Sequence, residues 1–394
     1  MKIGIKDLAN RIILLQILWI LFFGLVYSYY PQIGMWAYVP DVLNLILIIF
    51  VFRKIKYGLK IEYMLFLFFI LYALISSLWG DMDWYYIFSN ARRYISAFII
   101  YYVSSEYMTI KYWNKGINIL LLVQGINVLI TMYQNLVMKL HPDFCNGIFG
   151  FRNYDNAIQG IFCILISIVA MVYFLDKKWT MLKMIYAIGS SCLVCAFAEI
   201  KAYYVLLLFA FFVAFFFRCD DPKLRKKIIS FVFVAVLLLF AAYKVLEVIF
   251  PANLSTFFNL SQYIMYEQYG AHGGAGRLTS ISYIYNNVFD GDIIKTLFGC
   301  GLGRIANDYV YTIGKLFVAF GTVGLLLFLI WLMYVCVKYC KNIKMNSENL
   351  ISVILALMIL ATLFVWNALF TQVVFLIFWF LGCHSVNQNE LKNC

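Results

Sequence analysis

Long apolar runs are the feature that most constrains how this chain can fold. Stretches such as "FVFVAVLLLF" (231–240) and "GLLLFLIWLMY" (324–334) belong to runs of about 15 to 22 residues, a length that spans a bilayer core as a helix. The chain is 64% hydrophobic and only 13% charged, whereas soluble domains average roughly 25% charged residues. We therefore expect an all-α polytopic membrane protein.

The apolar runs predict about twelve transmembrane helices. They form a single transmembrane domain over residues 1–394, with no separate soluble domain. The expected spans are 12–30, 39–53, 62–80, 93–108, 116–138, 157–175, 184–198, 201–217, 228–250, 315–337, 350–365 and 367–383.

Positive charge predicts the orientation of these spans. Most of the 31 basic residues fall in loops on the same side as the N-terminus, and "RCDDPKLRKK" (218–227) is the clearest such loop. Because cytoplasmic loops are enriched in Lys and Arg, we expect both termini in the cytoplasm. The same rule accounts for the net charge of +12 without any nucleic-acid partner. The predicted cytoplasmic loops are too short for a soluble catalytic domain, which excludes ATP-driven pumps and kinases.

One long loop, 251–314, is expected outside the cytoplasm. Within it, "TSISYIYNNVF" (279–289) has apolar residues at helical spacing, which predicts a short amphipathic helix on the membrane surface. The loop also contains "AHGGAGRLTS" (271–280) and "GCGLG" (299–303). Glycines permit close backbone approach, so we expect the second stretch to fold tightly over a site.

Several cations break the charge rule, because they are predicted at or near the outer face. They are Arg92, Arg93, Arg152, Lys201, Arg277 and Arg304. Cations in such places oppose the correct topology and are costly at membrane depth. Together they predict a cationic cavity. A local alternative exists for some of them, since Lys201 could pair with Glu199 and Arg304 with Asp308.

The chemistry of such a cavity favours a lipid-linked phosphate or diphosphate. The guanidinium group binds phosphate through two parallel hydrogen bonds and keeps its charge, while apolar walls suit a long lipid tail. Nucleotides are not supplied outside the cytoplasm, so a transferase there would use an activated lipid-linked donor. The sequence has no outer group of His, Cys or acidic residues at metal-ligand spacing, and we expect neither metal nor cofactor.

Three stretches, taken in order, carry a family resemblance. They are "GFRNYDNAIQG" (150–160), "AEIKAYYVLLLF" (198–209) and the segment from "GAGRLTSISYIY" (274–285) through "LFGCGLGRIANDYVYTIGKLFVAFGTVGLLLFLIW" (297–331). Over about 150–335 the chain resembles the O-antigen ligase/polymerase superfamily of membrane glycosyltransferases. The resemblance implies a GT-C-type helical bundle with one long extracytoplasmic loop, in a bacterial cytoplasmic (inner) membrane.

Within the superfamily, ligases have a His followed by Asn, Ser or Gln shortly before the Gly-x-x-Gly that here is Gly321 and Gly324. This chain has Val310 and Tyr311 at those places. The resemblance therefore favours a Wzy-type polymerase, which joins undecaprenyl-diphosphate-linked oligosaccharide repeats into O-antigen or a related surface polysaccharide. The resemblance implies a lipid-linked glycan as donor, another lipid-linked glycan as acceptor, and surrounding membrane lipid. It is also compatible with a chain-length regulator as a protein partner.

The resemblance and the charge pattern together give each candidate residue a role. Arg277 and Arg304 are expected to hold the diphosphates together with Arg92, Arg93 or Arg152, while Lys201 lies at the same face. His272 is the first candidate for the general base, because an imidazole titrates near ~6.5. Glu199 and Asp308 are the carboxylate alternatives.

Two other functions remain open at this point. A ligase of the same superfamily would transfer finished polymer to another acceptor. A lipid-linked oligosaccharide flippase or other transporter would also have about twelve spans and cations in the membrane, but it would not need a long polar outer loop.

Overall fold

The computed structural model describes residues 4–55, 58–80, 83–151, 156–218, 279–303, 312–341, 343, 346–365 and 374–386, with Leu237, Phe240 and Lys244. The α-helices are α1 (Ile5–Tyr29), α2 (Val39–Ile55), α3 (Ile61–Ser76), α4 (Trp84–Tyr107), α5 (Ile110–Met132), α6 (Asn156–Leu175), α7 (Met181–Phe197), α8 (Lys201–Arg218), α12 (Ser280–Asn287), α13 (Ile293–Phe298), α14 (Thr312–Cys340), α15 (Ser347–Val365) and α16 (Val374–Leu381). Short 3-10 turns are η1 (Pro31–Tyr38), η3 (Pro142–Phe144), η4 (Gly147–Phe149) and η5 (Gly382–Ser385), and η2 (Tyr133–Val137) is a π-helical turn.

The expected all-α class is confirmed, since every regular element in the described ranges is a helix. Helices cover most of the described residues of the predicted spans, but 228–250 lies almost entirely outside the described ranges and 367–383 lies partly outside them. Seven helical stretches are long and apolar enough to cross a membrane: Ile5–Tyr29, Pro31–Arg53, Ile110–Val137, Asn156–Leu175, Lys201–Arg218, Thr312–Cys340 and Ser347–Phe364. The architecture is compatible with a polytopic membrane protein.

One boundary differs from the prediction in a way that affects the site. The fourth span was expected to begin at residue 93, but α4 begins at Trp84. Asp83 caps this helix, since its carboxylate accepts hydrogen bonds from the backbone N–H groups of Tyr85 and Tyr86. Arg92 therefore lies about two turns inside the helix rather than just before its first residue. A cap residue, and not the first apolar residue, sets the start of α4.

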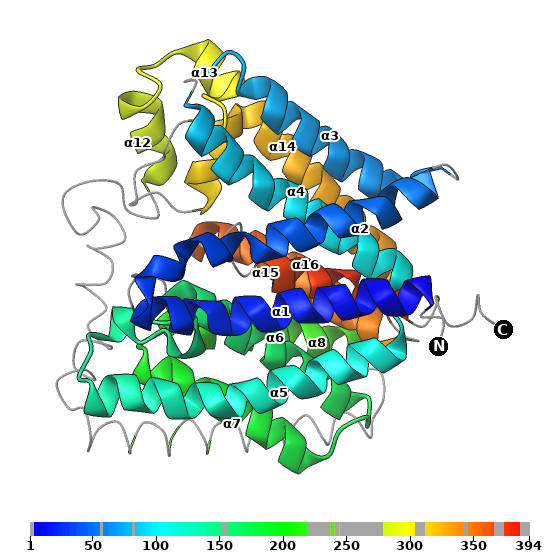
Figure 1. The fold of residues 1–394 in the computed structure, drawn as a ribbon, viewed down its shortest axis with the longest axis vertical. Helices are drawn as coiled ribbons and strands as arrows, with labels where there is room; N and C mark the ends of the chain where they lie inside the picture. The colour runs from blue at the N-terminus through cyan, green and yellow to red at the C-terminus, as the bar shows by residue number, and fades with distance from the viewer. Residues whose placement is uncertain are drawn as a thin grey trace.

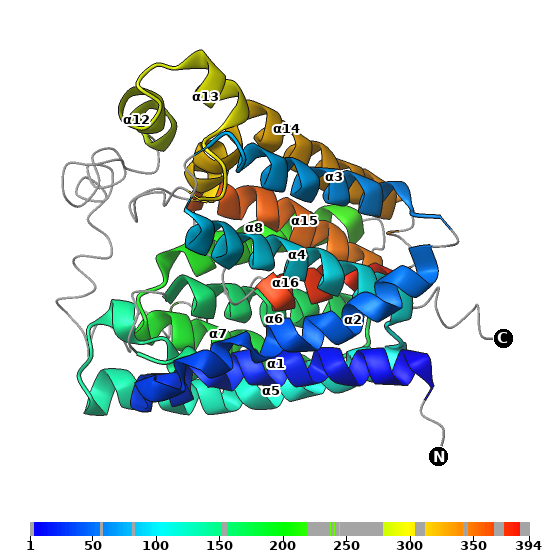
Figure 2. The ribbon, with the colours of Figure 1, turned by 45° about the horizontal axis from the view of Figure 1, so that its top comes forward.

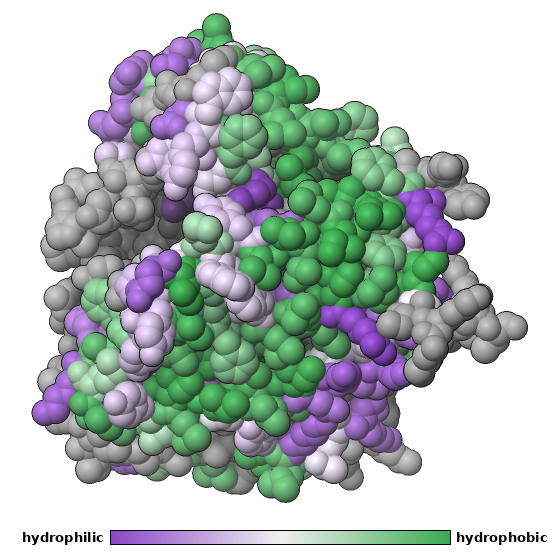
Figure 3. Space-filling view, viewed as in Figure 1, coloured by the Kyte–Doolittle hydropathy of each residue, from purple (hydrophilic) through white to green (hydrophobic). Residues whose placement is uncertain are grey.

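The helices run side by side around α6, which is buried along nearly all of its length and packs against α5, α7, α8 and α15 (Figures 1 and 2). A helix that is apolar on every side belongs in the centre of a bundle. An aromatic cluster joins α3, α14 and α16, where the Phe66 ring stacks on Trp331 at 4.4 Å and on Phe378 at 5.4 Å. The outer surface over α1, α2 and α3 is mainly hydrophobic, with hydrophilic residues toward the margins (Figure 3).

The bundle has two chemically different ends. At the loop end, α1, α3, α5 and α7 finish and α4, α6, α8 and α14 begin, and α12 and α13 also lie there, at the left of Figure 1. At the lysine end, opposite, the N-terminus enters α1 and the connections between α2 and α3 and between α6 and α7 supply Lys60 and Lys178.

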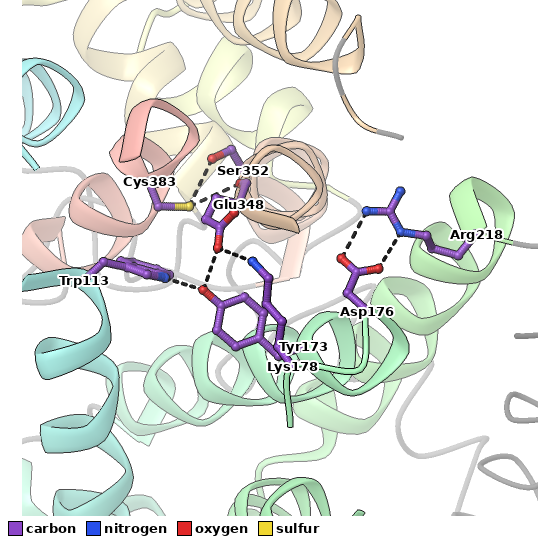
Figure 4. A network of polar contacts seen from close by, with 8 residues as sticks. All are labelled: Trp113, Tyr173, Asp176, Lys178, Arg218, Glu348, Ser352 and Cys383. Carbon is purple, nitrogen blue, oxygen red and sulfur yellow. Dashed lines mark hydrogen bonds and ion pairs between the residues drawn. The ribbon is translucent and has the colours of Figure 1, made fainter. Parts of the chain in front are cut away.

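Buried ion pairs tie the lysine end together. Glu348 is fully buried at the start of α15 and accepts hydrogen bonds from the Lys178 ammonium at 2.7 Å and the Tyr173 hydroxyl at 2.8 Å (Figure 4). Arg218, the last residue of α8, pairs bidentately with Asp176 at 2.8 and 3.1 Å. These contacts join α6, α8 and α15 through charged groups that are mostly buried, although the Lys178 side chain is 39% exposed.

The same arrangement recurs on the other side of this end. Glu106 is buried at the end of α4, pairs with Lys60 and accepts a hydrogen bond from the Tyr63 hydroxyl at 2.9 Å. Glu62, also buried, pairs with Lys338 of α14. The buried glutamates of the lysine end thus each have a lysine partner.

Candidate active site

Arg92 is the candidate cation whose surroundings the structure defines most closely. Its guanidinium donates to the Asp41 carboxylate at 2.7 Å and to the Ser89 carbonyl at 3.3 Å, and it lies over the Tyr38 ring at 4.5 Å from the centroid. Both partners of the ion pair are partly exposed, Arg92 by 30% and Asp41 by 26%. The pair links α4 to the start of α2 and leaves part of the guanidinium open to a ligand.

Arg93, the next residue, also acts on Asp41. Its positive charge lies within electrostatic range of that carboxylate, and its own side chain is half-buried. Ser96, one turn further along α4, lies 3.4 Å from the other Asp41 oxygen. The Asp41 carboxylate therefore lies within electrostatic range of two arginines at the loop end.

The glycine segment 299–303 is fixed by backbone contacts on two sides. Cys300 N–H donates to the Val318 carbonyl at 2.8 Å and Gly301 N–H to the Ala319 carbonyl at 2.9 Å. At Gly301, φ is +77° and a Cβ would meet the Ser77 Cα at 2.5 Å. Only glycine fits where the chain passes this close to α3. The expectation of a tightly folded segment is confirmed.

This segment also contacts α4. Leu302 N–H donates to the Ser77 hydroxyl at 2.9 Å, and its carbonyl accepts from the Asn90 side chain at 2.9 Å. Asn90 precedes Arg92 by two residues, and Leu302 precedes Arg304 by two residues. The hydrogen bond therefore brings the chain that leads into Arg304 next to the helix that carries Arg92 and Arg93.

A second glycine loop, which leads into Arg152, rests on a buried amide network. The Asn127 carboxamide oxygen accepts from Ile148 N–H at 3.0 Å, and Gln134 both accepts from Gly147 N–H at 2.8 Å and donates to the Gly147 carbonyl at 3.0 Å. Gln159 of α6 donates to Thr131 at 2.7 Å. Fully buried amides hold a loop well only when they are hydrogen-bonded, so this network fixes η4 against α5 and α6.

Glu199 lies in the tight turn between α7 and α8 and has an unusual backbone. Its φ is +50°, a left-handed conformation that costs a residue with a Cβ about 1 to 2 kcal/mol. Burial raises the pKa of its carboxyl above the usual value of 4.5, while nearby Lys201 opposes the shift and Asp143 adds to it. Strained backbone and a shifted pKa at one residue mark it as a candidate functional group.

Other polar residues surround the Glu199 turn. The Asn135 side chain donates to the Phe197 carbonyl at 2.9 Å, and Asn156 donates to the Ala198 carbonyl at 3.3 Å and to Asp143 at 3.2 Å. His141 lies 3.4 Å from Asp143 and is 66% exposed. Glu199 thus belongs to a polar, partly exposed cluster formed by η3, α6 and the α7–α8 turn.

The predicted site residues fall into three sets. Arg92 and Arg93 come together around Asp41. Lys201 lies within electrostatic range of Glu199, in line with the pairing of these two residues that the sequence offered as an alternative. No contact between these two groups is recorded in the described ranges. The remaining candidates lie outside those ranges: Arg152, His272, Arg277, Arg304 and Asp308.

Sequence reasoning missed three features of this end. Asp41 stands alone in the apolar "VPDVLNLILIIF" (39–50), and a carboxylate in such a run is itself a signal for a cationic partner. Asp143 and His141 in "KLHPDF" (139–144) lie near Glu199 only because α5 and α7 pack together. The amide network was visible as Gln and Asn within apolar spans, but its partners were not.

The predicted amphipathic helix is present as α12. Part of its apolar face packs against the protein rather than on the membrane surface, where it was expected. Ile284 is fully buried in a small cluster with Phe289, Phe317 and Val318 of the protein itself. Ile281 and Tyr285 are exposed by 41% and 42%. One part of α12 thus anchors it to α14, and the rest of its apolar face is open.

Comparisons with protein-family models and with curated proteins give no guide to this site. No family model matches the chain, and no curated protein matches it either. Within the described ranges, no group of three or more His, Cys, Asp or Glu side chains has the geometry to hold a metal ion.

Proposed function

We propose that the protein is a membrane glycosyltransferase that polymerises lipid-diphosphate-linked oligosaccharide repeats, with its active site at the loop end. In this proposal the chain is a GT-C-type bundle of about twelve spans in a bacterial cytoplasmic membrane, the lysine end is cytoplasmic and the loop end is extracytoplasmic. The sequence resemblance to the O-antigen ligase/polymerase superfamily supplies the reaction. The concentration of lysines at one end supports the orientation.

One observation carries the proposal furthest. The hydrogen bond from Asn90 to the Leu302 carbonyl joins the helix bearing Arg92 and Arg93 to the glycine segment that leads into Arg304. The helix that carries two arginines and the glycine segment, far apart in the sequence, thus meet at one end of the bundle. Arginines grouped in this way can bind a diphosphate and stabilise the charge that develops on it as a leaving group.

The proposed reaction forms one glycosidic bond and breaks one. The acceptor hydroxyl of a single lipid-linked repeat attacks the anomeric carbon of the growing chain, and the bond from that carbon to the lipid diphosphate breaks. The diphosphate leaves with the bonding electrons. A base removes the hydroxyl proton. His272 remains the first candidate for that base, and Glu199 now has independent support from its strained backbone and raised pKa.

An in vitro assay tests this function directly. Purified protein would be given a labelled lipid-diphosphate oligosaccharide, and the products would be resolved as a ladder. We expect Arg277→Ala to abolish the ladder and Glu199→Gln or His272→Ala, whichever removes the base, to slow it by about 10²- to 10⁴-fold. A full ladder from the Arg277→Ala protein would refute the proposal.

If Glu199 is the base, activity must depend on its ionisation. A base acts in its deprotonated form, and burial raises the pKa of Glu199 above 4.5. Activity should therefore rise with pH through a limb that lies above 4.5 and that is absent from residual Glu199→Gln activity. A limb that is unchanged in Glu199→Gln would assign the base to another residue.

The lipids that accumulate in a deletion strain separate the rival functions. Single-repeat lipid on the outer leaflet is the expected result for a polymerase. Single-repeat lipid on the inner leaflet would identify a flippase instead. Long lipid-linked polymer that fails to reach its final acceptor would identify a ligase.

A further inference from the structure

A groove between α1 and α5 lies outside the proposed active site. Its volume is about 690 Å³, and it begins at the lysine end, where Lys111 and Lys115 line it. Further along it is apolar, with Leu18 and Phe22 of α1 on one side and Leu122 of α5 on the other. The groove therefore has a cationic mouth and a hydrophobic interior.

The mouth is built to bind an anion. Lys111 and Lys115 are one turn apart on α5, and Asn114 and Asn118, also one turn apart, provide amide groups beside them. Lys183 of α7 reaches the same place, since its ammonium donates to the Asn118 side chain at 3.2 Å. Within the described part of the chain, Lys115 has no ion-pair or hydrogen-bond partner.

The neighbouring charges leave this mouth positive. Arg11 of α1 lies at the same end and is within 3.3 Å of the Tyr112 hydroxyl. The nearby carboxylate is Asp7, which acts on Arg11. Arg11 thus adds a cation of α1 to the lysines of α5 and α7 at this end.

The length of the groove corresponds to one leaflet. From Lys111 to Leu122 the axis of α5 advances by about 17 Å at ~1.5 Å per residue, which is roughly half of a ~30 Å hydrocarbon core. Leu122 is 65% exposed, so a chain lying in the groove would contact both the protein and the membrane. A charged head at one surface and an acyl chain reaching the bilayer centre would fit this distribution.

We propose that the α1–α5 groove binds one anionic phospholipid from the leaflet at the lysine end. The lysines hold its phosphate, the asparagine amides hydrogen-bond to its head group, and Leu18, Phe22 and Leu122 contact an acyl chain. Basic pockets between helices on the cytoplasmic side are suited to acidic lipid head groups. This site is independent of the glycosyltransferase proposal.

The test uses the full-length protein in vesicles with equal amounts of phosphatidylglycerol and phosphatidylcholine of matched chains. After gentle extraction, lipids that stay bound are measured by native mass spectrometry. We expect phosphatidylglycerol to be retained preferentially and the double variant Lys111→Gln/Lys115→Gln to retain it about tenfold less. The matched control is Lys177→Gln/Lys341→Gln, which removes the same charge at the same end but outside the groove, and it should behave as the wild type.

Three results would overturn the proposal. The first is equal retention of the two lipids by the wild type. The second is an equal loss in both double variants, which would mean that only general surface charge attracts the lipid. The third comes from filling the groove: Leu122→Trp should reduce retention, whereas Leu129→Trp, at an exposed position of α5 beyond the groove, should not. Retention unaffected by Leu122→Trp would place the lipid elsewhere.

Discussion

The two ends of this bundle use charged groups in opposite ways. At the lysine end, Glu62, Glu106 and Glu348 are each buried and each paired with a lysine. At the loop end, the Arg92–Asp41 pair is partly open, and Glu199 carries a raised pKa and a left-handed backbone. The buried carboxylates at the first end are satisfied within the protein, whereas the charged groups named at the second are only partly buried.

The difference teaches where stability and function reside. A buried carboxylate with a lysine and a tyrosine hydroxyl joins helices but has little left to offer a substrate. A strained residue in a polar, half-buried turn costs stability and persists where the surrounding structure enforces it. Substitutions at the lysine end should therefore act mainly on folding, and those at the loop end mainly on activity.

The largest expected effect on stability comes from breaking a buried pair. Lys178→Met removes the ammonium partner of the fully buried Glu348. The buried carboxylate, left with the Tyr173 hydroxyl but without the ammonium, should destabilise the protein by about 3 to 5 kcal/mol. Thermal unfolding of the detergent-solubilised protein would show this as a lower midpoint.

A double variant makes this prediction specific to the ion pair. Lys178→Met/Glu348→Gln removes the charge together with its partner, so it should recover most of the loss. Lys177→Met, at the exposed neighbouring residue, should leave the midpoint unchanged. If the double variant were as unstable as Lys178→Met alone, the pair would not be the cause.

A smaller effect on stability is expected at the loop end from Gly301→Ala. The new Cβ would meet the Ser77 Cα at 2.5 Å, and φ of +77° is unfavourable for alanine. The combined strain should cost about 1 to 3 kcal/mol. Because the segment must shift away from Ser77 and Asn90, activity should fall much further than stability does.

Gly189→Ala is the matched control for this substitution. A Cβ at Gly189, within α7, would meet nothing within 4 Å. Alanine should therefore be neutral or stabilise the helix by up to about 1 kcal/mol. Normal activity in Gly301→Ala would contradict the view that this glycine segment positions the site.

The sequence was informative about helices and much less so about contacts between them. Apolar runs predicted α1, α6 and α14 because the membrane requirement acts along one continuous stretch. The start of α4 was wrong by about two turns because a single capping residue, Asp83, decides it. Such a helix start can be predicted only when a capping residue is given more weight than the hydropathy of the residues that follow.

The sequence indicated candidate residue types for the site but not their geometry. The unusual position of Arg92 could be read from the charge rule, yet its pairing with Asp41 depends on α2 packing against α4. Glu199 was named for its carboxylate, but its φ of +50° is imposed by the turn that joins α7 to α8. Such features arise from tertiary packing, which no local pattern encodes.

The smallest expected effect is a gain in stability from Glu199→Gly. Glycine adopts φ of +50° without strain, so relief of the backbone should stabilise the protein by about 1 kcal/mol. Lys177, at the lysine end, has φ of +57° and provides the matched control, since Lys177→Gly should give a similar gain. Only the Glu199 variant should lose activity if that carboxylate is the base.

The pH dependence distinguishes the two variants further. The folded-state pKa of Glu199 is raised above 4.5. Its carboxyl therefore carries no burial penalty at a pH where it is protonated in both the folded and the unfolded chain. The stability of the protein then falls as pH rises through the folded-state pKa. At about pH 4, Glu199→Gly should therefore gain only the backbone term, as Lys177→Gly does. At about pH 7 it should gain the removed burial penalty as well, while the Lys177→Gly gain stays constant. Thermal midpoints of both variants at the two pH values test this. If the two gains changed in parallel with pH, Glu199 would not hold the perturbed carboxyl that sets the loop end apart.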